Sequence, residues 1–157
     1  MEPRNKEVIR VLNGLLMAEL TAINQYFVHY KICQNWGYER LSDRFKEASF
    51  SEMKDAEEIT ERILHLGGLP NLQRIGTFQV GETIPEQLRL SLELERSAVE
   101  ALSQAVVVCE REGDPATGTM LRAMALEEDE HLSWVEAQLE QISQIGEANY
   151  LTLQVKS

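Results

Sequence analysis

The amino-acid sequence predicts an all-α protein built as a four-helix bundle with one long crossover connection. Apolar residues recur at three- and four-residue intervals through nearly the whole chain, whereas the alternating pattern of a β-strand is sparse. Glycine and proline interrupt this periodicity at a few points and leave four long segments. At roughly 1.5 Å per residue, helices of this length would be roughly 40 to 48 Å long, which is typical of a bundle.

The first two segments form a helical hairpin. Residues 6–35 carry one apolar stripe, and Trp36-Gly37 ends the segment. Residues 39–66 carry a second stripe, which stops at Gly67-Gly68-Leu69-Pro70. The short turn between the two stripes favours two neighbouring helices in one hairpin.

A long connection separates this hairpin from the second one. Residues 67 to about 83 contain four glycines and one proline, too many for a continuing helix, and the stretch is too long for a tight turn, so we predict a crossover. The third helix is predicted at 85–111, starting at Pro85 and closed by Gly113. The fourth is predicted at 115–145, from Pro115 to just before Gly146, with a short fifth helix at about 147–155.

Composition describes one acidic domain, residues 1–157. A chain of 157 residues with 43% hydrophobic content can bury one sizeable core. Its 26 acidic and 15 basic side chains give a formal net charge of −11, which argues against a nucleic-acid partner. We expect no signal peptide and no membrane-spanning segment. Cys33 and Cys109 lie in apolar helical patterns without a close-spaced metal or redox motif, so we expect buried free thiols and a cytoplasmic location.

Ionisable residues occupy the apolar stripes of all four predicted helices. These positions are Glu19, Glu52, Glu95, Glu128 and His131. The two glutamates of each hairpin are 33 residues apart, which indicates a duplicated hairpin. Three residues after the second glutamate, on the same helical face, stands Asp55 in one hairpin and His131 in the other.

Buried carboxylates need compensation. An unpaired carboxylate in an apolar core is costly, and a cluster adds mutual repulsion, so the group must protonate or bind a cation. Arg62 is the only arginine near a stripe, and one guanidinium cannot neutralise the set. Oxygen-rich ligation with one imidazole suits Fe(II), Mn(II) or Zn(II), and bridging carboxylates permit a site for two ions.

Four runs of sequence carry a resemblance to a known family. They are AELTAINQYF at 18–27, SEMKDA at 51–56, RILHLGGLPNL at 62–72 and EEDEHLSW at 127–134. With them the chain resembles the bacterioferritins along its whole length. The resemblance implies a ferritin-like bundle, a hollow shell of 24 subunits, ferroxidase activity toward Fe(II) with oxygen or peroxide, and storage of ferric mineral. It also implies haem b shared by two subunits and a ferredoxin-type electron donor.

The resemblance also assigns roles to single residues. It makes Glu19, Glu52, Glu95, Glu128 and His131 the ligands of an intrasubunit di-iron site, with Glu52 and Glu128 able to bridge. Tyr26, seven residues after Glu19 on the same stripe, would donate a hydrogen bond to a ligand. The alternative for Tyr26 is an ordinary core tyrosine.

Asp55 is where the chain departs from the family, whose members with an intact centre have histidine at this position. Aspartate gives the site five carboxylates and one more negative charge. It either stays a hard ligand that favours Fe(III), or its shorter side chain weakens one iron position and slows oxidation. In the second case the chain would be a haem-binding structural subunit of a mixed shell whose second bacterioferritin subunit oxidises the iron.

Met53 follows Glu52 by one residue, so its side chain points roughly 100° away from the metal face. By resemblance it is the axial ligand of haem, one from each of two subunits, and thioether ligation raises the potential of haem iron. Leu20, Asn24 and Phe27 share one flank of the first helix and would line that pocket.

A further alternative is a di-iron peroxidase or oxygenase that shares the ligands but not the shell. Particle size would separate the two, because an isolated dimer contradicts storage in a shell.

Overall fold

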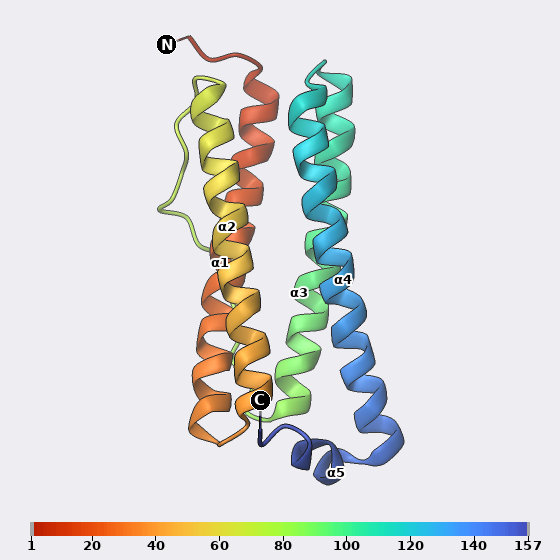
Figure 1. Cartoon of the computed structure of the whole chain (residues 1–157). Coiled ribbons are helices and arrows are strands. Elements are labelled where there is room, and N and C mark those ends of the chain that lie inside the picture. Colours follow the sequence, from red (N-terminus) through yellow and green to blue (C-terminus); the bar gives the residue numbers. More distant parts are fainter. Residues whose placement is uncertain (1, 157) are drawn as a thin grey trace.

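The computed structural model describes residues 2–156 as five helices without a strand (Figure 1). Four long helices run along the bundle: α1 (Lys6–Asn35), α2 (Glu39–His65), α3 (Ile84–Arg111) and α4 (Pro115–Ile145). The short α5 (Glu147–Thr152) lies across one end of the bundle. The prediction of an all-α four-helix bundle with one long crossover and a short fifth helix is confirmed.

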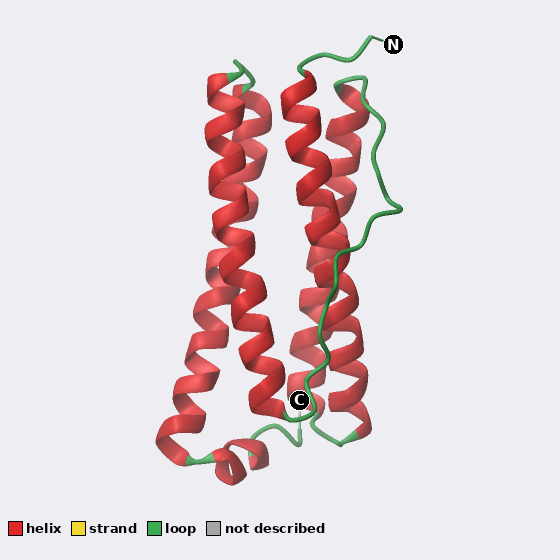
Figure 2. Ribbon diagram, turned by 180° about the vertical axis from the view of Figure 1, so that it is seen from behind, coloured by secondary structure: helices red, strands yellow, loops and turns green. Residues whose placement is uncertain are grey.

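The bundle consists of two helical hairpins, α1 with α2 and α3 with α4 (Figure 1). The crossover between them follows the length of the bundle along one side (Figure 2). Hydrogen bonds fasten it to α1 at three points. Asn13 donates to the carbonyl of Leu69 at 3.2 Å and accepts from the N–H of Asn71 at 2.8 Å. Further along, the N–H of Gly76 donates to Thr21 Oγ1 at 2.7 Å, and the N–H of Gly81 donates to His29 Nε2 at 3.0 Å.

Side-chain caps and glycines explain where the helices begin and end. Asn5, Thr83 and Asp114 accept hydrogen bonds from the first-turn amides of α1, α3 and α4. Gly67 follows α2 with φ of 82°, and a Cβ there would approach the carbonyl oxygen of Glu2 to 2.8 Å, so the turn requires glycine.

Three predicted boundaries differ from the structure. α2 ends at His65 rather than residue 66, because Leu66 is the cap before the left-handed Gly67. α3 begins at Ile84 rather than residue 85, because Thr83 supplies its cap. α5 ends at Thr152 rather than near residue 155, because the chain closes in a turn with bonds from Leu153 and Gln154 to the carbonyls of Tyr150 and Leu151.

Two apolar clusters fill the interior on either side of a polar middle. One contains Leu12, Leu16, Ile59 and Leu121, and the other contains Tyr26, Phe45, Leu88 and Tyr150. Cys109 lies in the first and Cys33 in the second, both as free buried thiols, as the sequence predicts. Among the described helices, none is long and apolar enough to span a bilayer.

Candidate metal centre

Six candidate ligands converge in the polar middle of the bundle. α1 supplies Glu19, α2 supplies Glu52 and Asp55, α3 supplies Glu95, and α4 supplies Glu128 and His131. The five carboxylate residues are at most 4% exposed. Because α2 and α4 each present residues three apart on one face, each of these helices offers two donors to the same point.

The donor atoms form two overlapping groups. Glu52, Glu95, Glu128 and His131 can each place one donor atom within 4.8 Å of the others. Glu19, Glu52, Asp55 and Glu128 can do the same. The structure therefore brings Asp55 together with the predicted ligands, and Glu52 and Glu128 belong to both groups.

Glu95 is the carboxylate that the protein holds in place. The hydroxyl of Tyr26 donates a hydrogen bond to Glu95 Oε1, and His131 Nδ1 lies 3.9 Å from the same oxygen. The other oxygen of Glu95, Oε2, has no hydrogen-bond partner within the described chain, and the same is true of one buried oxygen of each of the other four carboxylates. Unpartnered buried oxygens of this kind are suited to receive a cation.

The carboxyl groups of the centre differ in the direction in which their pKa values are shifted. Burial raises the pKa of Glu52 and Glu128 well above the ordinary value. Burial also opposes ionisation of Glu95, but hydrogen bonds from Glu128, His131 and Tyr26 outweigh it and lower the pKa of that carboxyl. Without a cation, Glu95 is thus the ionised member of a group that otherwise holds protons.

The other two carboxyl groups also resist ionisation. Burial raises the pKa of Glu19 to about 8, although a hydrogen bond with Glu52 works against the shift. Burial raises the pKa of Asp55 to about 7, with further contributions from the negative charges of Glu127 and Glu58. A bound cation would reverse these shifts, because it stabilises the ionised form of each carboxyl.

Arg62, the candidate counter-charge from the sequence, does not serve the centre. Its guanidinium binds Asp114 at 3.3 Å and Thr117 Oγ1 at 2.8 Å, where it supports the start of α4. Among the described residues, the only basic side chain within 4.0 Å of a carboxylate oxygen of the centre is the His131 imidazole, beside Glu95. The five carboxylates therefore lack a cationic side chain that could neutralise them.

A cavity of about 560 Å³ leads to one side of the centre. α1, α3 and crossover residues 76–79 enclose it, and its lining includes Glu19 and Glu52. On the side of His131 the corresponding space is about 10 Å³, lined by Tyr26, Phe45 and Trp134 among others. The guanidinium of Arg44 lies 4.7 Å above the Trp134 ring there. The two sides of the centre therefore differ in the size of the cavity beside them, while the His131 side chain is the most exposed of the six candidate ligands.

Sequence reasoning missed Gln25 as a residue of this region. Its side chain is buried, its Nε2 has no hydrogen-bond partner, and it lines the cavity beside Glu19. The signal was present, because Glu19, Ala22 and Gln25 follow each other at three-residue intervals on one helical face. His29 was missed as well, although it fastens the crossover through Gly81.

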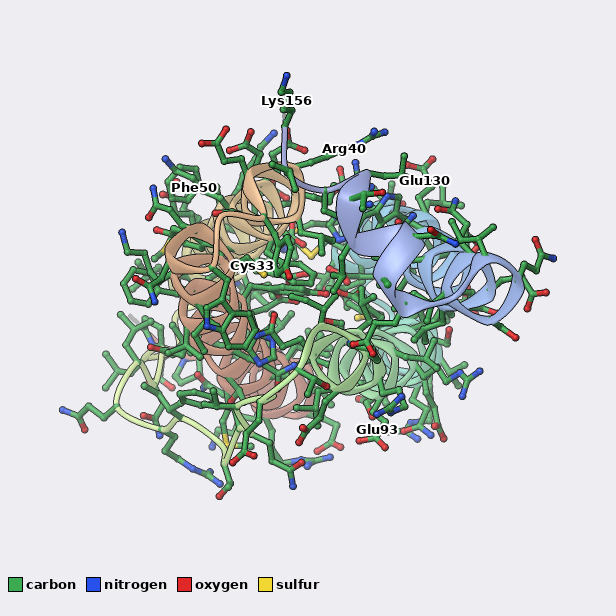
Figure 3. The ribbon with its side chains drawn as sticks, turned by 90° about the horizontal axis from the view of Figure 1, so that it is seen from below. Cys33, Arg40, Phe50, Glu93, Glu130 and Lys156 are labelled. Atoms are coloured by element: carbon green, nitrogen blue, oxygen red, sulfur yellow. The ribbon has the colours of Figure 1, made fainter. Side chains whose placement is uncertain are left out.

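The residues predicted to line a haem pocket lie outside this centre. Met53 is 45% exposed and Phe27 is 48% exposed, while Leu20 and Asn24 are partly buried. Phe50, 62% exposed, lies at the outer edge of the α1–α2 hairpin (Figure 3). The outer faces of α1 and α2 thus present large apolar side chains to their surroundings.

The amino-acid sequence is similar to those of known proteins. The family described as Ferritin-like domain matches residues 9–145. The bacterioferritin of Mycobacterium leprae is 43% identical over 144 residues, which cover 92% of this chain and 91% of the relative. Bacterioferritin of Streptomyces coelicolor is 39% identical, covering 93% and 87% of the two chains. That of Brucella melitensis is 33% identical, covering 92% and 89%.

Proposed function

Because this chain belongs to the bacterioferritins, within the ferritin-like family, we propose that it is a subunit for iron storage and detoxification. In this function Fe(II) binds in the buried centre of the subunit, is oxidised by oxygen or peroxide, and is stored as ferric mineral in a hollow shell. The activity of the centre is that of a ferroxidase.

One observation carries the proposal: five buried carboxylates and one imidazole converge from four helices, and residues 2–156 place no lysine or arginine against them. Such a cluster destabilises a bundle unless it binds cations or protons, so a purely structural role gives no reason for it. Carboxylate oxygens with imidazole nitrogen are donors that suit Fe(II), and shared carboxylates allow two ions to bind side by side.

Each residue has a role in this proposal. Glu52 and Glu128 bridge the two ions, Glu19 and Glu95 are terminal ligands, and His131 contributes nitrogen. Asp55 is a further oxygen ligand, and Tyr26 orients Glu95 through its hydroxyl. Bound Fe(II) supplies one electron per ion to the oxidant, while the carboxylates that give up protons on binding stabilise the more highly charged product.

The outer faces of α1 and α2 support a second part of the proposal, a haem b site between two subunits. The thioether of Met53 is accessible as an axial ligand, one from each subunit. Leu20, Asn24 and Phe27 would line the pocket, and Asn24 is already oriented by a hydrogen bond to the carbonyl of Leu20 at 2.7 Å. The haem would carry electrons to stored iron.

The proposed assembly is a 24-subunit shell in the cytoplasm, built from this chain alone or together with a second bacterioferritin subunit, with a ferredoxin-type protein as the electron donor. The exposed apolar residues on α1 and α2 support association between copies. A di-iron peroxidase or oxygenase without a shell would instead be an isolated dimer, which sedimentation would reveal.

Asp55 is the reason to consider an alternative function, in which the chain is a haem-binding structural subunit whose own oxidation site is impaired. What favours an active centre over this alternative is the position of the Asp55 carboxylate, within 4.8 Å of donor atoms from Glu19, Glu52 and Glu128. A side chain too short to reach the ions would lie outside this group.

Stopped-flow absorbance tests the proposal. Fe(II) is mixed aerobically, at two ions per subunit, with homogeneous shells of the protein and of an Asp55→His variant. We expect a fast ferric absorbance phase in the unmodified protein, and its loss in a Glu128→Gln variant that lacks a shared ligand. A fast phase in Asp55→His alone would support the structural-subunit alternative, and none in either protein would refute oxidation at this centre.

A further inference from the structure

The two overlapping donor groups are chemically different. Two cations that share Glu52 and Glu128 would each have two ligands of their own. At one position, here called the imidazole position, these are Glu95 and His131. At the other, the carboxylate position, they are Glu19 and Asp55.

The carboxylate position offers only anionic oxygen. Its four donors come from Glu19, Glu52, Asp55 and Glu128, all almost completely buried. Carboxylate oxygens are hard ligands that favour cations of high charge, whereas imidazole favours borderline divalent ions such as Fe(II), Co(II) and Zn(II). Replacing one neutral nitrogen donor with a charged oxygen therefore shifts preference from a divalent toward a trivalent cation.

The two positions also differ in how firmly their ligands are held. The hydroxyl of Tyr26 fixes Glu95 at the imidazole position, and His131 lies 3.9 Å from the same carboxylate oxygen. One oxygen is unpartnered among the described residues at both positions, Glu95 Oε2 at the first and Glu19 Oε2 and Asp55 Oδ2 at the second. At the carboxylate position, however, no described residue outside the ligand set plays the part that Tyr26 plays for Glu95. Ligands that are already oriented lose less freedom on binding, so the imidazole position is the better prepared of the two.

From this arrangement we propose that the centre is intrinsically asymmetric: the imidazole position takes the first divalent cation, and the carboxylate position prefers a trivalent one. The inference rests on the proposed function, because it assumes that each subunit binds two cations. In iron storage, the carboxylate position would retain Fe(III) while the imidazole position admits Fe(II).

Redox-inert cations test the asymmetry without any measurement of oxidation. Co(II), whose visible absorption reports nitrogen ligation, and Tb(III), whose luminescence is excited through nearby aromatic residues, are added separately to assembled, chelator-treated protein. A double variant, Glu52→Gln with Glu128→Gln, lacks both shared ligands and serves as the background control. Its signal measures metal bound by acidic groups elsewhere on the protein. After its subtraction, we expect one tightly bound Co(II) and one tightly bound Tb(III) per subunit.

Variants of the two distinguishing residues then have opposite effects. Asp55→His should create a second tight Co(II) site and weaken Tb(III) binding by at least tenfold. Asp55→Asn, of nearly the same size, should weaken Tb(III) without adding a Co(II) site. His131→Asp should abolish the tight Co(II) site and add a second Tb(III), which tests the same asymmetry from the other hairpin if an Asp55 variant fails to fold.

The outcomes separate this inference from the proposed function. Two equivalent Co(II) sites in the unmodified protein, or Asp55 and His131 variants that bind both cations as it does, would overturn the asymmetry and leave a two-cation centre standing. If instead the unmodified protein binds no more Co(II) or Tb(III) than the double variant, the centre does not bind metal, and both proposals fail.

Discussion

The α1–α2 hairpin and the α3–α4 hairpin each contribute a pair of glutamates to the centre, but they differ in the third candidate ligand that accompanies the pair. Each places two buried glutamates 33 residues apart, and each adds a donor one helical turn after the second glutamate. In the first hairpin this donor is Asp55, and in the second it is His131.

The environments of the two hairpins differ as well. Glu95 of the second hairpin is bound by Tyr26, which reaches across from α1. The cavity beside His131 is only about 10 Å³, although the His131 side chain itself is 23% exposed. Glu19 and Glu52 of the first hairpin line a cavity of about 560 Å³. The comparison teaches that repetition of the backbone sets where the donors lie, while single side chains decide their charge, orientation and access.

The largest effect on metal binding should come from substitution of the two glutamates that belong to both cation positions, one from each hairpin. Replacing Glu52 or Glu128 with glutamine removes a charged donor from both positions, whereas Glu19→Gln or Glu95→Gln removes one from a single position. We expect the shared variants to lose affinity for Co(II) at the imidazole position and for Tb(III) at the carboxylate position by more than roughly 100-fold, beyond the 10- to 100-fold typical of residues that only orient a ligand. Calorimetric stoichiometry checks this, and an intact site in either shared variant would contradict the bridging role.

The next effect concerns the pH dependence of the stability of the metal-free protein. It arises from two carboxyl groups of the first hairpin. The folded-state pKa values of Glu19 and Asp55, about 8 and about 7, exceed those of carboxyl groups in an unfolded chain, roughly 4. Between these values the folded state binds more protons than the unfolded state, so the free energy of unfolding falls as the pH rises. We expect a Tm several degrees lower at pH 8 than at pH 5.5.

Asp55→Asn isolates this contribution. The variant has no side-chain charge to acquire, so its Tm should fall less between pH 5.5 and pH 8 than that of the unmodified protein. Asp129→Asn, at an exposed position, is the matched control and should keep the original slope. Equal slopes in all three proteins, measured by thermal unfolding without metal, would show that Asp55 ionises freely in the folded state.

A smaller effect should follow from Tyr26→Phe, which removes the hydroxyl that orients Glu95. We expect Co(II) affinity at the imidazole position to fall by about tenfold and Tb(III) affinity at the carboxylate position to stay unchanged. Tyr30→Phe, on the same helix and outside the centre, should change neither affinity. Equal losses at both positions would mean that Tyr26 supports the bundle rather than one ligand.

Much of this geometry was predictable, because helical periodicity fixes which residues share a face. The stripe containing Glu19 and Tyr26 and the repeated spacing of the glutamates were enough to expect a cluster of carboxylates between four helices. Helix ends followed from glycine, proline and capping residues to within a few residues. These are local rules, and they operate over one or two helical turns.

Long-range packing was harder to predict. The sequence left open whether Asp55 reaches the other ligands, because the answer depends on the distance between α2 and the remaining helices. It did not single out Gln25 or His29, whose surroundings are created by a crossover that lies about 50 residues further along the chain. Arg62 stood near a stripe but finds its partners at the start of α4, where the bundle end brings Asp114 and Thr117 together.

The difference in access between the hairpins leads to the smallest effect, one on rate alone. Ala98 lines the cavity that reaches Glu19 and Glu52, and the cavity lining does not include His131. A phenylalanine at this position would occupy part of that space without altering a donor atom. In stopped-flow mixing with Tb(III), Ala98→Phe should therefore slow binding at the carboxylate position several-fold while leaving the equilibrium affinity unchanged. Ala123→Phe, at an exposed position on α4, is the control for an added aromatic ring. An unchanged rate in Ala98→Phe would mean that cations reach the centre by another path, past the partly exposed His131 rather than through this cavity.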